Sequence, residues 1–292
     1  MSLDLAESAR SLVNTRSERV RTEISRLIET LRVTGNFAVT NRQVEDWIAS
    51  KDFFFILALG RSGTTFLAHL LNMVPNAVVF HEPARSDIDA YRRAFFSPDD
   101  AERYIASFRK KEMYLRARTR DFRVYGEVNS LLRRHSEALK HQFPKGGFLH
   151  MVRDGRNVVR TMMSTDALKP GFMWTWWLRP HESDPFYAQW STMDRFAKLC
   201  WYWRVENHHL RTTIGNTVKF EDVVQDYECF EQRILRPFGL VMPEAVWKQH
   251  SGVQRNSTST YSLPHWREWD AHHLRTFESI CGDEMRANGY LQ

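Results

Sequence analysis

FFFILALGRSGTTFLAHLLN, residues 53–72, joins a continuous apolar run to a helical pattern through a short polar loop. Apolar residues fill positions 53–59 without a break, which is typical of a strand buried on both faces. Leu67, Leu70, Leu71 and Val74 then recur at helical spacing. The stretch therefore predicts a buried strand, a loop at 60–65 and a helix, in that order.

The loop itself, GRSGTT, has the composition of an anion-binding site. Two glycines allow backbone N–H groups to turn inward, and the start of the following helix adds positive partial charge. An arginine supplies a planar guanidinium that fits phosphate or sulfate, and three hydroxyls add donors. The alternative is an ordinary strand-to-helix turn. The expected ligands are Gly60, Arg61, Ser62, Gly63, Thr64 and Thr65.

The rest of the chain repeats this alternation of strands and helices. Apolar runs at 77–80, 122–125, 148–152 and 217–220 predict four more strands between helical patterns. Such alternation is typical of a parallel sheet covered on both faces. We therefore expect an α/β protein of the P-loop-like, three-layer α/β/α type, with a central parallel sheet of about five strands and helical insertions.

A single domain at 1–292 is the simplest organisation, because the sequence contains no internal repeat and no low-complexity linker. Within it we expect N-terminal helices at 1–50 and a nucleotide-binding core at 53–240, followed by a C-terminal segment at 241–292. A Trp-rich helical insertion is expected at 165–210. An apolar stripe predicts an amphipathic N-terminal helix: Val20, Ile24, Leu27, Ile28 and Leu31.

Composition narrows the classes of partner. The net charge is +6, from 41 Lys plus Arg against 35 Asp plus Glu, which suits an anionic ligand. No long basic block is present, so we expect no nucleic-acid partner. The three cysteines are scattered, the N-terminal residues lack a signal pattern, and no apolar run is long enough to span a membrane. These features predict a cytoplasmic protein without a metal site.

A second candidate anion site lies in LHMVRDGRNVVRTMMS, residues 149–164. Arg153 ends a predicted buried strand, and Thr161 follows eight residues later on a helix. Strand ends of a parallel sheet share one edge, so this pair is expected beside GRSGTT. The alternative is that Asp154 only pairs with an arginine at the helix start.

The ordered pair GRSGTT and VRDGRNVVRT, about 90 residues apart and followed by KFEDV, resembles the PAPS-dependent sulfotransferases. PAPS is 3′-phosphoadenosine 5′-phosphosulfate, and its product is PAP. The resemblance implies that the first motif binds the 5′-phosphosulfate and that Arg153 and Thr161 bind the 3′-phosphate. It also implies a PAPS-dependent transferase that requires no metal.

Within this family, Arg61 and the string MVRDGR are most similar to the tyrosylprotein and Golgi carbohydrate branch and to bacterial members. Three positions depart from the family pattern. Thr161 replaces a serine, Phe66 stands where one branch has a tryptophan, and GEVNS lacks the lysine that several members place after the third strand. Together with the missing signal, this favours a bacterial-type enzyme.

The expected reaction is in-line attack of an acceptor hydroxyl or amine on the sulfuryl group. Arg61 would stabilise the leaving phosphate. Glu82, at the end of the second strand, is the expected general base, and the resemblance supports a glutamate in this place. His81 is the rival base or an acceptor contact. Alternatively, Glu82 forms a surface ion pair with Arg85.

Acceptor contacts are expected from two regions. Glu127 and Asn129 follow the predicted third strand, and their alternative is a helix cap. Six of the ten tryptophans lie within 174–203, either as an aromatic wall over the acceptor or as core. The named acceptor candidates are Trp174, Trp176 and Trp177. For Tyr202 and Trp203 the prediction is core packing, with stacking on adenine as the alternative. The resemblance also implies a C-terminal loop that covers the 3′-phosphate and adenine, with Ser257, Ser259 and Arg267 as candidates.

The acceptor itself stays open: a small molecule, a glycan, a lipid-linked sugar or a peptide tyrosine. Two other functions remain as alternatives. A P-loop nucleotide or small-molecule kinase would need a lysine in the loop and Mg²⁺ ligands. A non-catalytic anion-binding protein would keep the loop without needing Glu82.

Overall fold

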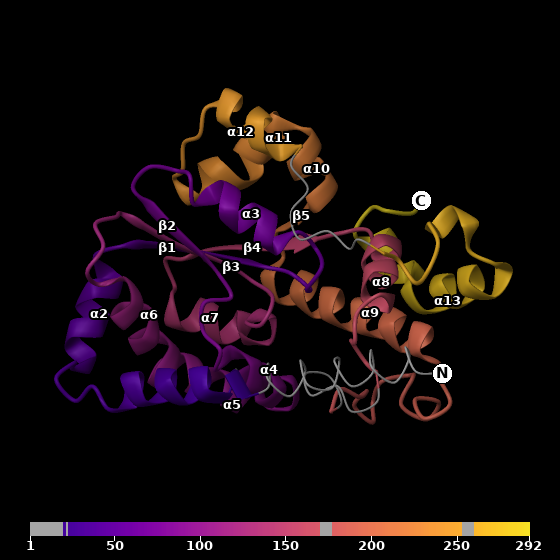
Figure 1. The fold of residues 1–292 in the computed structure, drawn as a ribbon, viewed down its shortest axis with the longest axis horizontal. Helices are drawn as coiled ribbons and strands as arrows, with labels where there is room; N and C mark the ends of the chain where they lie inside the picture. The colour runs from indigo at the N-terminus through magenta and orange to yellow at the C-terminus, as the bar shows by residue number, and fades with distance from the viewer. Residues whose placement is uncertain (1–19, 22, 170–176, 253–259) are drawn as a thin grey trace, which may run out of the picture.

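The core of the molecule is a sheet of five parallel strands (Figure 1). The computed structural model describes residues 20, 21, 23–169, 177–252 and 260–292. The strand order is β2-β3-β1-β4-β5, so the strand before GRSGTT lies in the centre. The strands are β1 (Asp52–Leu57), β2 (Ala77–His81), β3 (Val124–Asn129), β4 (Gly147–Val152) and β5 (Thr217–Lys219).

Alternate residues of β1 enter two separate hydrophobic layers, as the two-residue period of a strand requires. Phe54 and Ile56 pack with the layer that includes α3, whereas Phe53, Phe55 and Leu57 pack with the layer that includes α7. Because both faces are apolar, helices must cover both. The predicted three-layer α/β/α fold with a five-stranded parallel sheet is therefore confirmed.

Helices form the outer layers, with α3 and α10–α12 on one face and α2 and α4–α7 on the other (Figure 1). Helices α8, α9 and α13 pack together beside β4 and β5. The helices are α2 (Asn41–Ala49), α3 (Thr64–Leu71), α4 (Asp87–Phe96), α5 (Pro98–Tyr104), α6 (Lys110–Ala117), α7 (Ser136–Gln142), α8 (Gly155–Met163), α9 (Arg195–Ile214), α10 (Phe220–Gln225), α11 (Tyr227–Phe230), α12 (Glu244–Ser251) and α13 (Ala271–Ala287).

Shorter helical turns connect several of these elements. Two are π-helical, at Ile105–Arg109 and Glu231–Leu235, and three are 3₁₀-helical, at Arg133–His135, Arg236–Phe238 and Trp266–Glu268. A further helix covers residues 23–34, ahead of α2.

Two expectations from the sequence were wrong in their boundaries. The third strand extends through Asn129 instead of ending at 125. The Phe54 ring packs directly on the backbone of Gly126, and Val128 is buried, so both residues fit inside the sheet. The predicted helical insertion is also wrong in part. Its described residues 177–194 form turns, and helix starts only at Arg195 as α9, which precedes β5.

Candidate active site

The carboxyl ends of the five strands bring the predicted motifs to one edge of the sheet. Leu57 of β1 is in register with Asn129 of β3 on one side and with His150 of β4 on the other. The segments that follow these strands therefore lie next to each other, which is where α/β sheets bind ligands. GRSGTT, Glu82, Ser130 and Arg153 all follow strand ends at this edge.

The GRSGTT loop has the backbone of an anion cradle. Arg61 and Gly63 both adopt left-handed conformations, with φ of 70° and 92°. Gly63 is the N-cap of α3 and has no side chain with which to cap the first helical amides. These N–H groups face the loop and favour a bound anion.

Ser62 adds a second sign that the loop accepts a polar ligand. Its side chain is fully buried, and Oγ has no hydrogen-bond partner within the described part of the chain. A buried hydroxyl without a partner costs free energy that a ligand oxygen would restore. Gly60 has room beside it, since a Cβ at this position would lie 3.8 Å from the nearest contact, Ser130 Oγ.

Two guanidinium groups converge on this loop. Arg153 Nη1 donates to the carbonyl oxygen of Arg61 at 2.9 Å. Burial, and next the positive charge of Arg153, lower the pKa of Arg61, whereas Tyr261 raises it. Two neighbouring cations that disfavour each other are stabilised by an anion that contacts both.

The second motif separates into two roles. Asp154 caps α8 through Arg156 N at 2.9 Å and pairs with the Arg156 side chain at 2.7 Å. The alternative reading of this motif is therefore correct for Arg156, while Arg153 is directed to the loop. Thr161 is buried, and its hydroxyl donates to Asn157 O at 2.8 Å. Thr161 would have to redirect this hydroxyl to bind a phosphate.

The C-terminal segment packs along α8. The Arg160 guanidinium lies 3.7 Å from the ring centroid of Tyr261, and Arg160 Nε donates to Leu263 O at 3.1 Å. The Arg156 guanidinium lies 4.0 Å from the ring centroid of Trp266, and Arg267 is exposed and also contacts this ring. Ser257 and Ser259 lie outside the described residues.

Glu82 and His81 meet the loop from β2. His81 Nε2 lies 2.9 Å from Thr64 Oγ1, 3.4 Å from Thr65 Oγ1 and 3.7 Å from Glu82 Oε1. Glu82 Oε1 accepts from Ser130 N at 3.3 Å and from Ser130 Oγ. The carboxylate is about a quarter exposed, so it is held in place and still accessible.

Glu82 also has a strained backbone, with φ of 44°. A non-glycine residue in this region costs roughly 1–3 kcal/mol, and such strain occurs often at active sites. Among the described residues, Glu82 Oε1 lies 3.7 Å from His81 Nε2, and no ion pair joins Glu82 to Arg85. The alternative of a surface ion pair with Arg85 is therefore wrong.

The structure places Glu127 and Asn129 in the interior rather than in the cleft. Both side chains are fully buried. Glu127 accepts two bonds of 2.8 Å from Arg109, which also pairs with Asp87. Asn129 Oδ1 accepts from Leu131 N at 2.8 Å and from Leu132 N at 3.1 Å, so it holds the turn after β3, and neither residue caps a helix as the alternative had it. The expectation that these side chains face an acceptor was wrong because β3 is longer than predicted.

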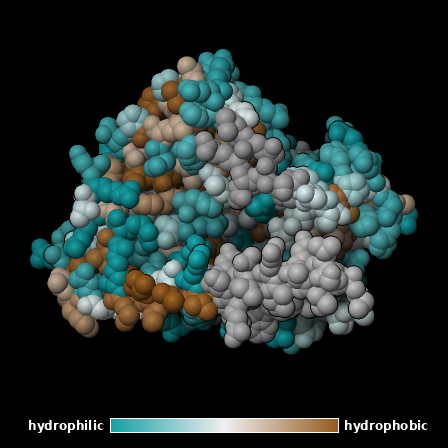
Figure 2. All heavy atoms as spheres, viewed as in Figure 1, coloured by the Kyte–Doolittle hydropathy of each residue, from teal (hydrophilic) through white to brown (hydrophobic). Residues whose placement is uncertain are grey.

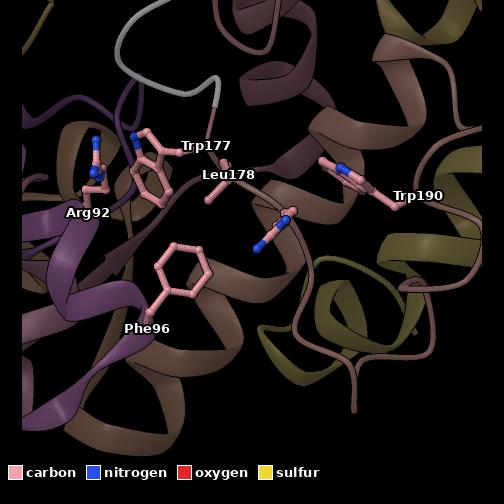
Figure 3. Close-up of a pocket in the computed structure, with 6 residues that line it drawn as sticks. Arg92, Phe96, Trp177, Leu178 and Trp190 are labelled. Atoms are coloured by element: carbon pink, nitrogen blue, oxygen red, sulfur yellow. The ribbon is translucent and has the colours of Figure 1, made fainter.

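Trp177 lines a shallow pocket of about 390 Å³ between α4 and the segment that precedes α9. Figure 3 shows the rings of Phe96 and Trp177 on one side and Trp190 on the other. The lining residues are Arg92, Phe96, Trp177, Leu178, Arg179 and Trp190. Trp174 and Trp176 lie outside the described residues.

Tyr202 and Trp203 belong to the core. Both are buried, and Trp203 Nε1 donates to Arg153 O at 3.2 Å. Trp203 packs directly on Gly155, where a Cβ would meet the indole at 2.8 Å. The predicted core role is therefore confirmed. Trp203 also stabilises the backbone of the second motif at Arg153 and Gly155.

Sequence reasoning missed three residues of this edge. Ser130 positions Glu82, although it was visible in GEVNS. Phe220 packs against Gly63, and the Arg153 guanidinium lies 5.3 Å from its ring centroid. Glu221 accepts from Asp154 N at 3.1 Å and from the Tyr290 hydroxyl at 2.6 Å. KFEDV contains the last two, and its proximity to the motifs was the available signal.

No cluster of three or more metal-ligating side chains occurs in the described ranges. None of the helices in these ranges is long and apolar enough to cross a bilayer.

The fold is that of an α/β protein of the P-loop-like class, with a glycine-containing loop at a helix start, a second arginine at the adjacent strand end and a held carboxylate. The profile of the Sulfotransferase family matches residues 54–244, more than half of the 292-residue chain. The chain therefore belongs to the sulfotransferase family. No curated protein sequence gives a significant match.

Solved structures of sulfotransferases are similar to the chain at low identity. STF1 from Mycobacterium tuberculosis H37Rv is 16% identical, with 91% of this chain and 85% of that chain covered and a TM-score of 0.48. STF9 from Mycobacterium avium is 13% identical, with 86% and 82% covered and a TM-score of 0.48. Mouse SULT7A1, solved in complex with PAP, is 12% identical, with 85% and 90% covered and a TM-score of 0.43.

Proposed function

We propose that the chain is a PAPS-dependent sulfotransferase that transfers a sulfuryl group to a hydroxyl or amine acceptor. The observation that carries this proposal is that Arg153 reaches the loop that contains Arg61. Arg153 Nη1 donates to the backbone carbonyl oxygen of Arg61 at 2.9 Å. In addition, Glu82 lies next to the same loop through Thr64 and His81. Family membership gives the reaction class, and the residues give the roles.

The residues present fit a nucleotide with two phosphate groups. The 5′-phosphosulfate would bind the uncapped amides of α3, Ser62 Oγ and Arg61. The 3′-phosphate would bind Arg153 at the adjacent strand end, with Thr161 nearby on α8. PAPS would supply the sulfuryl group, already activated by its bond to phosphate.

In the proposed step, Glu82 accepts the proton of the acceptor hydroxyl while the acceptor oxygen forms a bond to sulfur. The bond between sulfur and the bridging phosphate oxygen breaks, and its electron pair stays on that oxygen. Arg61 and the first amides of α3 are placed to stabilise this charge. Ser130 holds Glu82 Oε1 by two donors, which leaves Oε2 for the acceptor.

The acceptor would approach from the Trp177 pocket. The Trp177 and Tyr91 ring centroids are 5.4 Å apart, and the Arg133 guanidinium lies 3.9 Å from the Tyr91 centroid. Arg133 also binds Ser130 O, and Ser130 binds Glu82. A short series of contacts therefore connects the pocket to the proposed base. Its aromatic lining favours an acceptor with an apolar or aromatic body or a sugar ring.

Replacing Trp177 tests the acceptor route. Trp177→Ala removes a ring that contacts Tyr91, Phe95 and Phe96. We expect KM for the acceptor to rise about 2- to 12-fold, as loss of one stacking ring predicts, with PAP affinity unchanged. Tyr187→Ala is the matched control, because this ring is exposed on the same segment and does not line the pocket. Equal KM in both variants would place the acceptor elsewhere.

The donor assignment is tested by calorimetric titration of the full chain with PAP and, separately, with 5′-AMP, both without metal. We expect micromolar affinity for PAP and at least about tenfold weaker binding of 5′-AMP, because only PAP has a phosphate for Arg153. Equal affinity would remove the second phosphate site. Absence of binding for both, with ATP and Mg²⁺ bound instead, would favour the kinase alternative.

A further inference from the structure

The helix at residues 23–34 contacts the rest of the chain mainly through its polar side. Arg26 pairs with Asp89 of α4. Glu29 accepts from Ser86 N at 2.8 Å and pairs with Arg116 of α6 at 3.4 Å. Because these pairs lie on one side of the helix and involve two other helices, they fix which side faces outward.

The outward side is apolar. It carries the aliphatic stripe that the sequence predicted, and the structure leaves each of its side chains more than half exposed. Figure 2 shows this surface as a brown patch along the lower edge, where Figure 1 draws the indigo helix. The exposed fractions are Val20 52%, Ile24 52%, Leu27 59%, Ile28 61% and Leu31 61%.

Such an arrangement is incomplete in a monomer. Helices of this length are marginal in water and gain most of their stability from packing of the apolar face. The partly buried ion pairs of Arg26 and Glu29 hold the helix against the body but bury none of the apolar stripe. Val33 is buried against the body, but the main apolar stripe is not. The burial that would stabilise the helix must therefore come from another surface.

The spacing of the stripe indicates what kind of surface that is. Val20, Ile24, Leu27 and Leu31 follow one another at intervals of four, three and four residues. These four residues follow the a/d repeat of helices that pack side by side, and Ile28 adds a flanking e position, as in the apolar faces of helix bundles. The stripe therefore fits another helix with the same repeat.

We propose that the stripe is a homodimer interface in which two copies of this helix pack antiparallel about a two-fold axis. The axis would pass between Ile24 and Leu27, so that Ile24 packs on Leu27 of the partner subunit. Val20 would then pack on Leu31 of the partner subunit. Isologous contacts of this type close the assembly at two copies.

Charge and area agree with this pairing. Glu23 lies on one edge of the stripe, and Arg21 on the other. Antiparallel packing places Glu23 opposite Thr30 of the partner subunit and Arg21 opposite Ile28 of the partner subunit, so no like charges meet. The exposed stripe presents roughly 500 Å² per copy, or about 1,000 Å² in a pair, the lower limit of specific interfaces. We therefore expect a dimer with micromolar affinity.

Analytical ultracentrifugation of the full chain tests the interface. The wild type should change from monomer to dimer between low and high micromolar concentration. Leu27→Glu should weaken dimerisation at least about 100-fold, because it places a buried charge on each side of the axis. Ser25→Glu is the matched control, since it adds the same charge to an exposed position of the same helix outside the stripe, and it should dimerise like the wild type.

Three results would overturn the proposal. A wild-type protein that stays monomeric at all concentrations has no such interface. A dimer that Leu27→Glu leaves intact uses another surface. A monomer that sediments with anionic phospholipid vesicles, and loses this with Leu27→Glu, would make the stripe a lipid-binding surface. Because Leu27 is exposed, the melting temperatures of both variants should match that of the wild type at low micromolar concentration, where the wild type is a monomer, which separates loss of the interface from unfolding.

Discussion

Glu82→Gln lowers kcat about 10²- to 10⁴-fold, the usual contribution of a general base, and leaves PAP affinity unchanged. This is the expected result if the carboxylate takes the acceptor proton. Gln keeps the shape of the side chain and a carbonyl oxygen that accepts from Ser130. The loop and its anion ligands are therefore preserved, and the loss would be chemical. Steady-state kinetics and PAP titration of the same preparation measure both quantities.

His81 provides the matched comparison, since its ring lies 3.7 Å from the same carboxylate oxygen. Its contact with Thr64 Oγ1 at 2.9 Å suits a positioning role for the loop hydroxyl. His81→Gln should therefore cost less in kcat than Glu82→Gln. A fully active Glu82→Gln variant beside an inactive His81→Gln variant would transfer the role of base to His81.

Arg153→Ala weakens PAP binding about 10- to 150-fold, corresponding to roughly 1.5–3 kcal/mol for hydrogen bonds to a charged group. This loss of affinity should be specific to the 3′-phosphate. 5′-AMP, which lacks the 3′-phosphate, should lose much less affinity, so the ratio between the two nucleotides should fall. Calorimetric titration with both nucleotides measures this ratio directly.

Arg123→Ala is the control for this substitution. Arg123 also carries one positive charge, but it is exposed, pairs with Asp52 at the start of β1 and lies at the opposite edge of the sheet. Arg123→Ala should change neither the affinity for PAP nor the affinity for 5′-AMP. If Arg153→Ala weakens PAP and 5′-AMP by the same factor, then Arg153 acts by holding the Arg61 carbonyl, and the second phosphate site is disproved.

The sequence predicted the elements that depend on local pattern. A short unbroken apolar run that ends at a glycine favours a strand with both faces covered, so the central strand and its loop followed from residues 53–72. The motif pair followed because parallel strands end at a common edge. The resemblance of MVRDGR to the tyrosylprotein branch stays a prediction, because the family match does not identify a branch.

The sequence pattern did not predict features that depend on contacts between residues far apart in the chain. Glu127 reads as a polar residue after a strand, and only the fold reveals that Arg109 neutralises it inside the protein. Likewise, the stripe from Val20 to Leu31 gives the periodicity of a helix but not which side meets the body. The ion pairs of Arg26 with Asp89 and of Glu29 with Arg116, which decide this, involve residues more than 50 positions away.

Residues 177–194, which contribute to the proposed acceptor pocket, form neither helix nor strand. The acceptor side of the proposed reaction can therefore change in evolution more readily than the donor side. No ladder of backbone hydrogen bonds in the sheet depends on this segment, whereas Arg61, Glu82 and Arg153 are fixed by strand ends. Loops positioned on a rigid scaffold tolerate substitution and insertion more readily than the scaffold does. Descendants of this chain would therefore exchange acceptors by remodelling this segment while inheriting the donor machinery unchanged.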